Sequence, residues 1–126
     1  MDVTPLIPEG RQIIQGYGPK GFKVSGVSFE GAIIVSPGQT QDWKAPETFS
    51  ALRESDFSMI EADAANIDVL LLGCGARGEF FPPQLRAALR EKGLVVETMD
   101  TGAACRTYNV LMAEGRRVAA ALMPVR

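Results

Sequence analysis

The chain has 126 residues and a formal net charge of −2, and 46% of its residues are apolar. These values fit a single globular domain, which we expect to span residues 1–126. The small negative charge gives no electrostatic footprint for nucleic acid or for an anionic membrane surface, so we expect neither as a partner. The chain contains no histidine, which excludes Ser-His-Asp and Cys-His catalysis and removes the commonest metal ligand.

The N-terminal segment, residues 1–10, carries two prolines and has an acidic residue at position 2. A signal peptide needs a basic start and a longer apolar run, and no stretch of the chain reaches the length of a membrane span. We therefore expect a loosely ordered segment at the start of a cytoplasmic protein that does not insert into membranes. Cys74 and Cys105 are then expected to be reduced. Two cysteines without histidine do not make a four-ligand zinc site, and we expect no metal and no cofactor.

The first third of the chain predicts β structure. Residues 11–15 fit a strand, and a turn rich in glycine and proline follows them. Alternating apolar residues over 22–29, a tight turn at Glu30-Gly31 and an apolar return over 32–35 predict an antiparallel hairpin.

The next part of the chain gives weaker signals. Residues 36–46 are expected to form a surface loop, in which Trp43 either covers the edge of the core or is an exposed interface anchor. Residues 47–53 predict a short helix, because their two large apolar residues stand three apart. Residues 59–66 fit neither helix nor strand clearly, and we leave them unassigned.

The second half of the chain predicts alternating strands and helices. Residues 67–72 are a nearly unbroken apolar run, typical of a strand buried on both faces of a parallel sheet. Further strands are expected at 94–98 and 118–125, with helices beginning near Pro82 and Thr101. This order implies two right-handed crossovers and three parallel strands. The expected fold is α/β: a compact three-layer domain with a mixed central sheet, an N-terminal antiparallel hairpin and a C-terminal parallel βαβαβ half.

A glycine motif follows the first of these parallel strands. Residues 73–78, Gly-Cys-Gly-Ala-Arg-Gly, spell the fingerprint of dinucleotide-binding domains. In those domains the third glycine lies inside the next helix, whereas here Glu79, Phe80 and Phe81 intervene before Pro82. Glu79 would also repel a pyrophosphate. The pattern favours a glycine-rich turn that leaves a buried strand over a dinucleotide site.

A second group of polar residues surrounds the start of the last helix. Asp100 or Thr101 can cap this helix, and the apolar stripe of the helix leaves Arg106 and Asn109 on an outward side. This side is either a recognition surface or a solvated helix face. Because ligands of open α/β sheets favour the carboxyl ends of strands, we expect a cleft between this group and the glycine turn. The predicted ligand- or partner-binding residues are Gly73, Gly75, Arg77, Asp100, Thr101, Cys105, Arg106 and Asn109.

The two cysteines each follow a predicted strand and could approach one another as a redox pair. Nothing in the sequence lowers the pKa of either thiol, except that Cys105 lies near a helix N-terminus. Ordinary thiols at or near the core are favoured, and we expect Cys105 at the border of its helix. No catalytic residue is assigned.

The C-terminal half resembles a known family. The stretch Met99 to Leu111 (MDTGAACRTYNVL), followed by Glu114 to Leu122 (EGRRVAAAL), is similar to the signature of the MTH-type domain family of unknown function. Leu70 to Gly75, Phe29 to Val35 and Trp43 also fit the family, so that the resemblance covers nearly the whole chain from about Ile13. The family includes the mitochondrial complex I assembly factor and bacterial relatives.

The resemblance implies a compact three-layer α/β fold and no established enzymatic activity. For mitochondrial members it implies a role in assembling respiratory complex I through protein partners. We therefore expect a bacterial-type interaction or assembly protein with a protein partner. The alternative is a small-molecule binder or enzyme that uses the cleft near Gly73–Gly78 and Asp100–Asn109.

Overall fold

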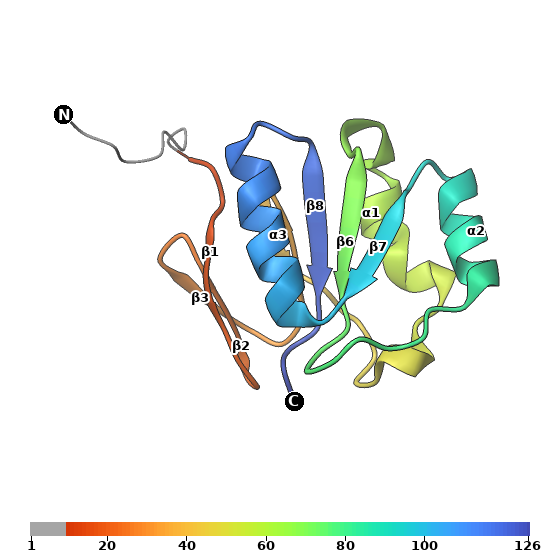
Figure 1. Ribbon diagram of the computed structural model, residues 1–126, viewed down its shortest axis with the longest axis horizontal. Coiled ribbons are helices and arrows are strands. Elements are labelled where there is room, and N and C mark those ends of the chain that lie inside the picture. Colours follow the sequence, from red (N-terminus) through yellow and green to blue (C-terminus); the bar gives the residue numbers. More distant parts are fainter. Residues whose placement is uncertain (1–9) are drawn as a thin grey trace.

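The computed structural model describes residues 10–126 (Figure 1). The loosely ordered segment that the sequence predicts over residues 1–10 lies, except for Gly10, outside the described residues. The described chain forms a five-stranded mixed sheet, a three-stranded antiparallel sheet and several helices. The predicted α/β class with a mixed central sheet is confirmed.

The central sheet has the strand order β5-β4-β8-β6-β7. Its strands are β4 (Ile33–Ser36), β5 (Gln39–Asp42), β6 (Val69–Gly73), β7 (Val96–Met99) and β8 (Val118–Leu122). Strand β6 runs parallel to both of its neighbours, with Leu71 opposite Glu97 of β7 and Ala120 of β8. Strand β4 runs antiparallel to β5 and β8. The expected parallel βαβαβ half is therefore present, and the sheet is extended by an antiparallel pair.

Two helices join the parallel strands and lie on opposite faces of the central sheet (Figure 1). Helix α2 (Pro83–Glu91) begins at a proline, whose missing N–H costs nothing in the first turn. Gly93, at a φ of 89°, then turns the chain away from α2. Helix α3 (Thr101–Ala113) begins directly after β7 and leads to β8. Both helices start where the sequence predicts them.

The smaller sheet consists of β1 (Ile14–Tyr17), β2 (Gly21–Val24) and β3 (Val27–Glu30) in that order. An N-terminal antiparallel hairpin is present, but β2 and β3 form it across a turn at Ser25-Gly26. The expected pairing of residues 22–29 with residues 32–35 across Glu30-Gly31 is wrong, because residues 33–36 are β4 of the central sheet. Ser25 and Gly26 both have positive φ, as the tight turns that match the twist of a hairpin require. At Gly31, where φ is 78°, the chain instead passes from this sheet into the central one.

The segment that follows β4 and leads to β6 differs from expectation in two places. Residues 39–42, expected in a surface loop, pair with β4 as the edge strand β5. The helix expected over 47–53 is a single 3-10 turn. The short helices on this side are η1 (Phe49–Ala51), η2 (Glu54–Phe57), α1 (Ser58–Glu61) and η3 (Ala64–Asn66). Their common role is to cover one face of the central sheet.

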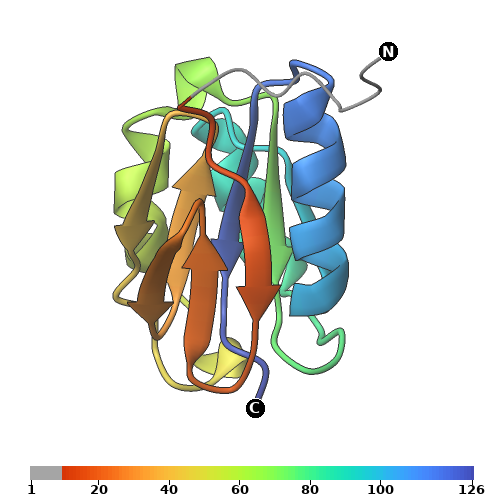
Figure 2. The same ribbon diagram turned by 90° about the vertical axis from the view of Figure 1, so that its left-hand side faces the viewer.

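The core is divided between the two faces of the central sheet, because successive residues of a strand point in opposite directions. Leu70 and Leu72 of β6 face Trp43, the short helices and α2. Leu71 faces α3 and the smaller sheet. Figure 2 shows the three-stranded sheet in front, with α3 beside it. This gives the expected three layers, with a sheet and a helix sharing one outer layer.

Among the described residues, no helix combines the length and the apolar character needed to cross a bilayer.

Candidate functional site

The glycine turn and the start of α3 are joined by a buried threonine. The Thr101 hydroxyl accepts a hydrogen bond of 2.9 Å from the Gly75 N–H and donates one of 2.6 Å to the Met123 carbonyl. The Thr101 N–H in turn donates to the Gly75 carbonyl at 2.8 Å. Thr101 has no exposed surface. We call Gly73, Gly75, Thr101 and Met123 the strand-end junction, because they fasten the ends of β6 and β8 to α3.

Glycine is required at two positions of this junction. A Cβ atom on Gly73 would lie 2.9 Å from the Thr101 hydroxyl oxygen and 3.1 Å from the Thr101 Cα. Gly75 has a φ of 103°, a conformation that residues with a side chain rarely adopt. The two glycines therefore allow the close approach of β6 to α3, and a nucleotide is not needed to explain them.

The N-terminus of α3 is capped by Asp100. Its Oδ1 accepts a hydrogen bond of 3.2 Å from the Ala103 N–H. Of the two residues expected as the cap, Asp100 therefore caps the helix, and Thr101 belongs to the strand-end junction. Asp100 and Thr101 thus have local structural partners within the fold.

Asn109 lies differently from the expected outward position. Its Oδ1 accepts a hydrogen bond of 2.9 Å from the Ile14 N–H, and its Nδ2 donates one of 2.8 Å to the Ile14 carbonyl. The carboxamide thereby binds the edge of β1 as a neighbouring strand would. Arg106 is exposed, as expected, and donates a 3.3 Å hydrogen bond to the Tyr17 hydroxyl. The outward side of α3 therefore offers Arg106 and not Asn109.

The cysteines are buried on opposite faces of the central sheet. Cys74 packs with Trp43 and Phe81, whereas Cys105 packs with Leu71 and the smaller sheet. Cys105 is 2% exposed and not at the helix border where we expected it, because α3 faces a second sheet as well as the central one. Burial raises the pKa of the Cys105 thiol to about 12, and burial also raises the pKa of Cys74. Both are free thiols with no redox partner in each other.

A hollow of about 670 Å³ opens at the carboxyl ends of β6 and β8. Residues Cys74–Arg77 and Glu79 form one side, Asp42, Trp43 and residues 45–50 form another, and Met123 and Pro124 also line it. We call this the strand-end hollow. A hollow is therefore present beside the glycine turn, but it does not lie between the turn and residues 100–109, as expected. Its second wall comes from the segment before and around Phe49.

The strand-end hollow is lined by buried apolar residues and by exposed charged ones. Trp43, Phe49 and Met123 line it and are each at least 95% buried. The Trp43 Nε1 donates to the Asp56 carbonyl at 2.7 Å, which fixes the indole in the wall. Trp43 therefore covers the core edge, one of the two roles the sequence left open.

The rim carries more acidic than basic side chains. Four exposed carboxylates and two exposed guanidinium groups give it a net charge of −2. They belong to Glu30, Asp42, Glu47, Glu79, Arg77 and Arg126. Arg126 forms a 2.8 Å ion pair with Glu47. Within residues 10–126, Arg77 forms no ion pair. Sequence reasoning singled out Gly75 and Arg77 of this hollow but missed the carboxylates, which come together only through the fold.

The loop from Ala76 to Phe80 is exposed throughout. Phe80 is 77% exposed, the largest exposed fraction among the large apolar side chains of the described chain. The next residue, Phe81, is buried and packs at 6.0 Å, ring centre to ring centre, against Phe49. The loop is therefore anchored by Phe81 and exposes Phe80 to solvent, next in the chain to Glu79, which lines the hollow.

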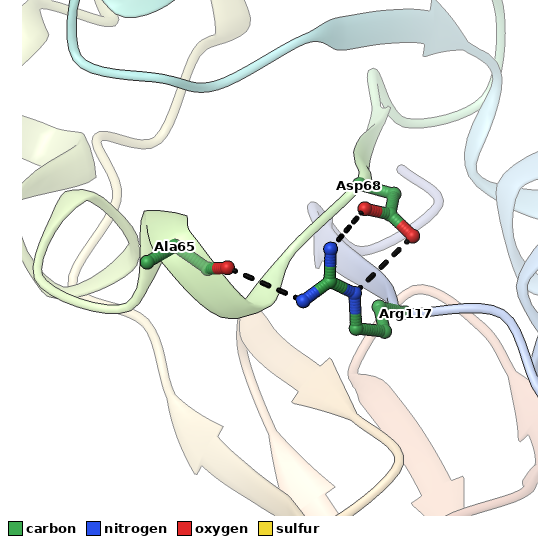
Figure 3. A network of polar contacts seen from close by, with 3 residues as sticks. All are labelled: Ala65, Asp68 and Arg117. Atoms are coloured by element: carbon green, nitrogen blue, oxygen red, sulfur yellow. Dashed lines mark hydrogen bonds and ion pairs between the residues drawn. The ribbon is translucent and has the colours of Figure 1, made fainter.

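A second hollow, of about 430 Å³, lies at the other end of the central sheet. It is lined by Arg11, Arg116 and Arg117 together with the β4–β5 turn, and we call it the basic hollow. Arg117 is held by Asp68 through two hydrogen bonds, the shorter at 2.7 Å, and by the Ala65 carbonyl (Figure 3). The hydrogen bond to Arg117 lowers the pKa of Asp68. This arrangement fastens the start of β6 to the start of β8.

Among residues 10–126, no three His, Cys, Asp or Glu side chains are placed to hold a metal ion.

Comparison with known proteins places the chain in a family. The family described as "Protein of unknown function (DUF498/DUF598)" matches residues 14–123, and the chain belongs to it. An uncharacterised protein of Rhodobacter capsulatus is 38% identical over 89% of the chain and 84% of its own length.

A zebrafish protein and a bacterial structure extend the comparison. The NADH dehydrogenase [ubiquinone] 1 alpha subcomplex assembly factor 3 of Danio rerio is 35% identical over 89% of the chain, which spans 64% of that factor. The solution structure of a Mth938-like domain protein of Bordetella pertussis superposes with a TM-score of 0.82. It is 31% identical and covers 98% of this chain and 92% of its own. The resemblance to the MTH-type family inferred from the C-terminal motif is thereby confirmed.

Proposed function

We propose that this member of the DUF498/DUF598 family is a cytoplasmic assembly protein that helps build a respiratory membrane complex through protein partners. The observation that carries the proposal is the 35% identity, over 89% of the chain, to a protein named as an assembly factor of NADH dehydrogenase. The chain spans only 64% of that factor, so the shared part is the α/β domain itself.

The site geometry supports binding over catalysis. Cys105 is buried with a raised pKa, and Asp100, Thr101 and Asn109 are engaged in holding the fold. The groups that face solvent are the charged rim of the strand-end hollow and the loop that carries Phe80. Exposed aromatic and charged side chains around an open hollow are typical of a protein-binding surface.

The eight residues singled out by the sequence then divide into two groups. We propose that Arg77 and Arg106, both exposed, contact a partner directly. The other six support the surface: they are Gly73, Gly75, Asp100, Thr101, Cys105 and Asn109. In this proposal a partner contacts the strand-end hollow and its rim, which includes Arg77, and also Arg106 on the outward side of α3.

Deletion of the gene in its native cells tests the proposal. We expect the amount of assembled NADH dehydrogenase to fall and its membrane-arm or peripheral-arm intermediates to accumulate on native gels. Succinate oxidation should stay unchanged, which controls for general damage to respiration. Expression of the wild-type chain from a plasmid should restore the assembled complex. Unchanged NADH dehydrogenase in the deletion strain would refute the assembly role, and recovery of the protein outside the cytoplasmic fraction would refute its location.

A further inference from the structure

We propose that the strand-end hollow binds an extended partner segment through one basic side chain followed by an apolar one. This rests on the proposed function, since it names the chemistry of the partner that an assembly protein would hold. The basic side chain enters the hollow, and the apolar residue beside it packs on Phe80.

The shape of the hollow fits a long side chain with a charged end. Its lower walls are formed by the indole of Trp43, by Phe49 and Met123, and by the small apolar residues Ala45 and Pro124. Lys and Arg bury their methylene stems against such surfaces while their charged heads remain at the rim. A volume of about 670 Å³ leaves room for one such side chain and for the backbone that carries it.

The charges of the rim select a cation. Glu47 is paired with Arg126, which leaves Glu30, Asp42 and Glu79 opposed by Arg77 alone. All four are exposed, so they keep their hydration until a partner arrives. A cationic head among three carboxylates is attracted from several directions, whereas an anionic head is repelled by all three.

The exposed loop supplies the second contact. Phe80 stands next to Glu79 in the chain and is 77% exposed, while the buried Phe81 holds the loop to the core. An apolar side chain adjacent to the basic one would cover Phe80, which removes apolar surface from water on both partners. The required partner segment is therefore short, extended and carries Arg or Lys beside an apolar residue.

The chain's own basic hollow offers a competing occupant. Arg11, Arg116 and Arg117 lie at the opposite end of the central sheet, so a second copy could place them against the acidic rim. Such contacts run head to tail and add copies without closing, unless the rotation between copies forms a ring. The hollow of each copy would then be filled in a concentration-dependent way, which an experiment separates from binding of a foreign segment.

The first experiment uses the wild-type protein and three capped hexapeptides. The first is Gly-Ser-Arg-Phe-Gly-Ser, the second has Glu in place of Arg, and the third has Ser in place of Phe. Trp43 is the only tryptophan of the chain and lies in the wall of the hollow, so its fluorescence reports binding there. Amide shifts in heteronuclear NMR spectra give the location.

We expect the Arg-Phe peptide to shift the amides of residues 75–80 and the Trp43 indole signal. The Glu peptide should bind at least about tenfold more weakly, and the affinity of the Arg-Phe peptide should fall as salt screens the rim. Equal binding of the Arg and Glu peptides, or shifts confined to other parts of the protein, would overturn the proposal.

Two matched variants on one loop are expected to change the affinity for the Arg-Phe peptide in opposite directions. Glu79→Gln removes an attracting charge, and we expect binding of the Arg-Phe peptide to weaken by up to about fivefold, the effect of one charge pair in water. Arg77→Gln removes a repelling charge and should strengthen binding by a similar factor. Both side chains are exposed and two residues apart, so a general disturbance of the loop would move both variants in the same direction. Glu114→Gln, on an exposed residue that does not line the hollow, is the control and should leave affinity unchanged.

Two further outcomes separate this proposal from the assembly role. If Glu79→Lys restores NADH dehydrogenase fully in the deletion strain, the hollow is not the partner site, although the assembly role stands. If deletion itself has no effect, the assembly role fails whatever the peptides do. A concentration-dependent rise in mass on sedimentation that Glu79→Lys abolishes would identify a second copy as the occupant and overturn the foreign segment.

Discussion

Residues 73–75 and residues 76–80 are consecutive in the chain but have opposite environments. The first three are buried and joined to Thr101 and Met123 by hydrogen bonds. The next five are exposed, and Ala76, Arg77 and Glu79 among them line the strand-end hollow. A single glycine motif thus ends a buried strand and begins an exposed loop. Neighbouring residues of one motif therefore have different roles: residues 73–75 hold the fold, and residues 76–80 face solvent.

The largest effect expected from this contrast is at Thr101. Thr101→Val keeps the shape but leaves the Gly75 N–H and the Met123 carbonyl without their buried partner, and we expect a loss of about 3 kcal/mol in the free energy of unfolding. Thr101→Ser keeps the hydroxyl and loses one methyl group, which costs about 1 kcal/mol. Urea unfolding of both variants is the measurement. Equal losses would mean that the hydroxyl does not hold the junction.

The next largest loss of stability is expected at Asn109, whose substitution tests the contact between α3 and β1. Asn109→Ala removes both hydrogen bonds to Ile14 and should cost about 2 kcal/mol. Amide exchange at Ile14 should also accelerate, because the edge of β1 loses its cover. If the melting temperature and the Ile14 amide exchange rate equal those of the wild type, the carboxamide is a surface group and is again a candidate recognition residue.

The buried thiols give a smaller and pH-dependent effect. Because folding raises the pKa of Cys105 from an ordinary value of 9.0 to about 12, the unfolded state releases the proton first as the pH rises. The free energy of unfolding should be unaffected by this thiol below pH 9 and should fall as the pH rises toward 12. Burial raises the pKa of Tyr108 too, and this acts in the same direction.

Cys105→Ala should remove part of that alkaline loss when unfolding is followed from pH 8 upward. At neutral pH, a thiol reagent should label neither cysteine until denaturant is added. Rapid labelling of Cys105 in the folded protein would contradict its position in the core.

The smallest effect is expected at Arg106. It is exposed and makes one 3.3 Å hydrogen bond, to a Tyr17 hydroxyl that is itself on the surface. Arg106→Ala should therefore change the free energy of unfolding by less than about 0.5 kcal/mol. Tyr17→Phe should change it as little, and the double variant should equal their sum. A loss above 1 kcal/mol, measured in urea, would place Arg106 with Asn109 among the residues that hold the fold.

The parallel half could be predicted from the sequence because its signals are local. The apolar runs of β6 and β8 and the proline start of α2 lie within short windows. Strand β5 was missed because Gln39–Asp42 is a polar edge strand without an apolar pattern. The hairpin turn was predicted at the wrong position because Ser25 adopts a positive φ, which the identity of this residue does not indicate.

The candidate site was predicted only in part for a physical reason. The glycine turn has a recognisable motif, and the cap at Asp100 follows from local geometry. The second wall of the hollow comes from residues 42–50, about thirty positions before the turn, and no local pattern links the two. Likewise, the partner of Asn109 is Ile14, which lies 95 positions away. Pairings at such distances are decided by the packing of the layers.

The position of β8 has a consequence for synthesis. Strand β8 comes last in the chain but occupies the middle of the central sheet, between β4 and β6. Until residues 118–122 have been synthesised, no strand lies between β4 and β6. Val35 of β4 therefore has no pairing partner on that side, because its partner is Ala120. The sheet can therefore close only after nearly all of the domain has been translated. Pairing across such a separation is slow, so the nascent chain passes through a period in which its apolar strands need protection from other chains.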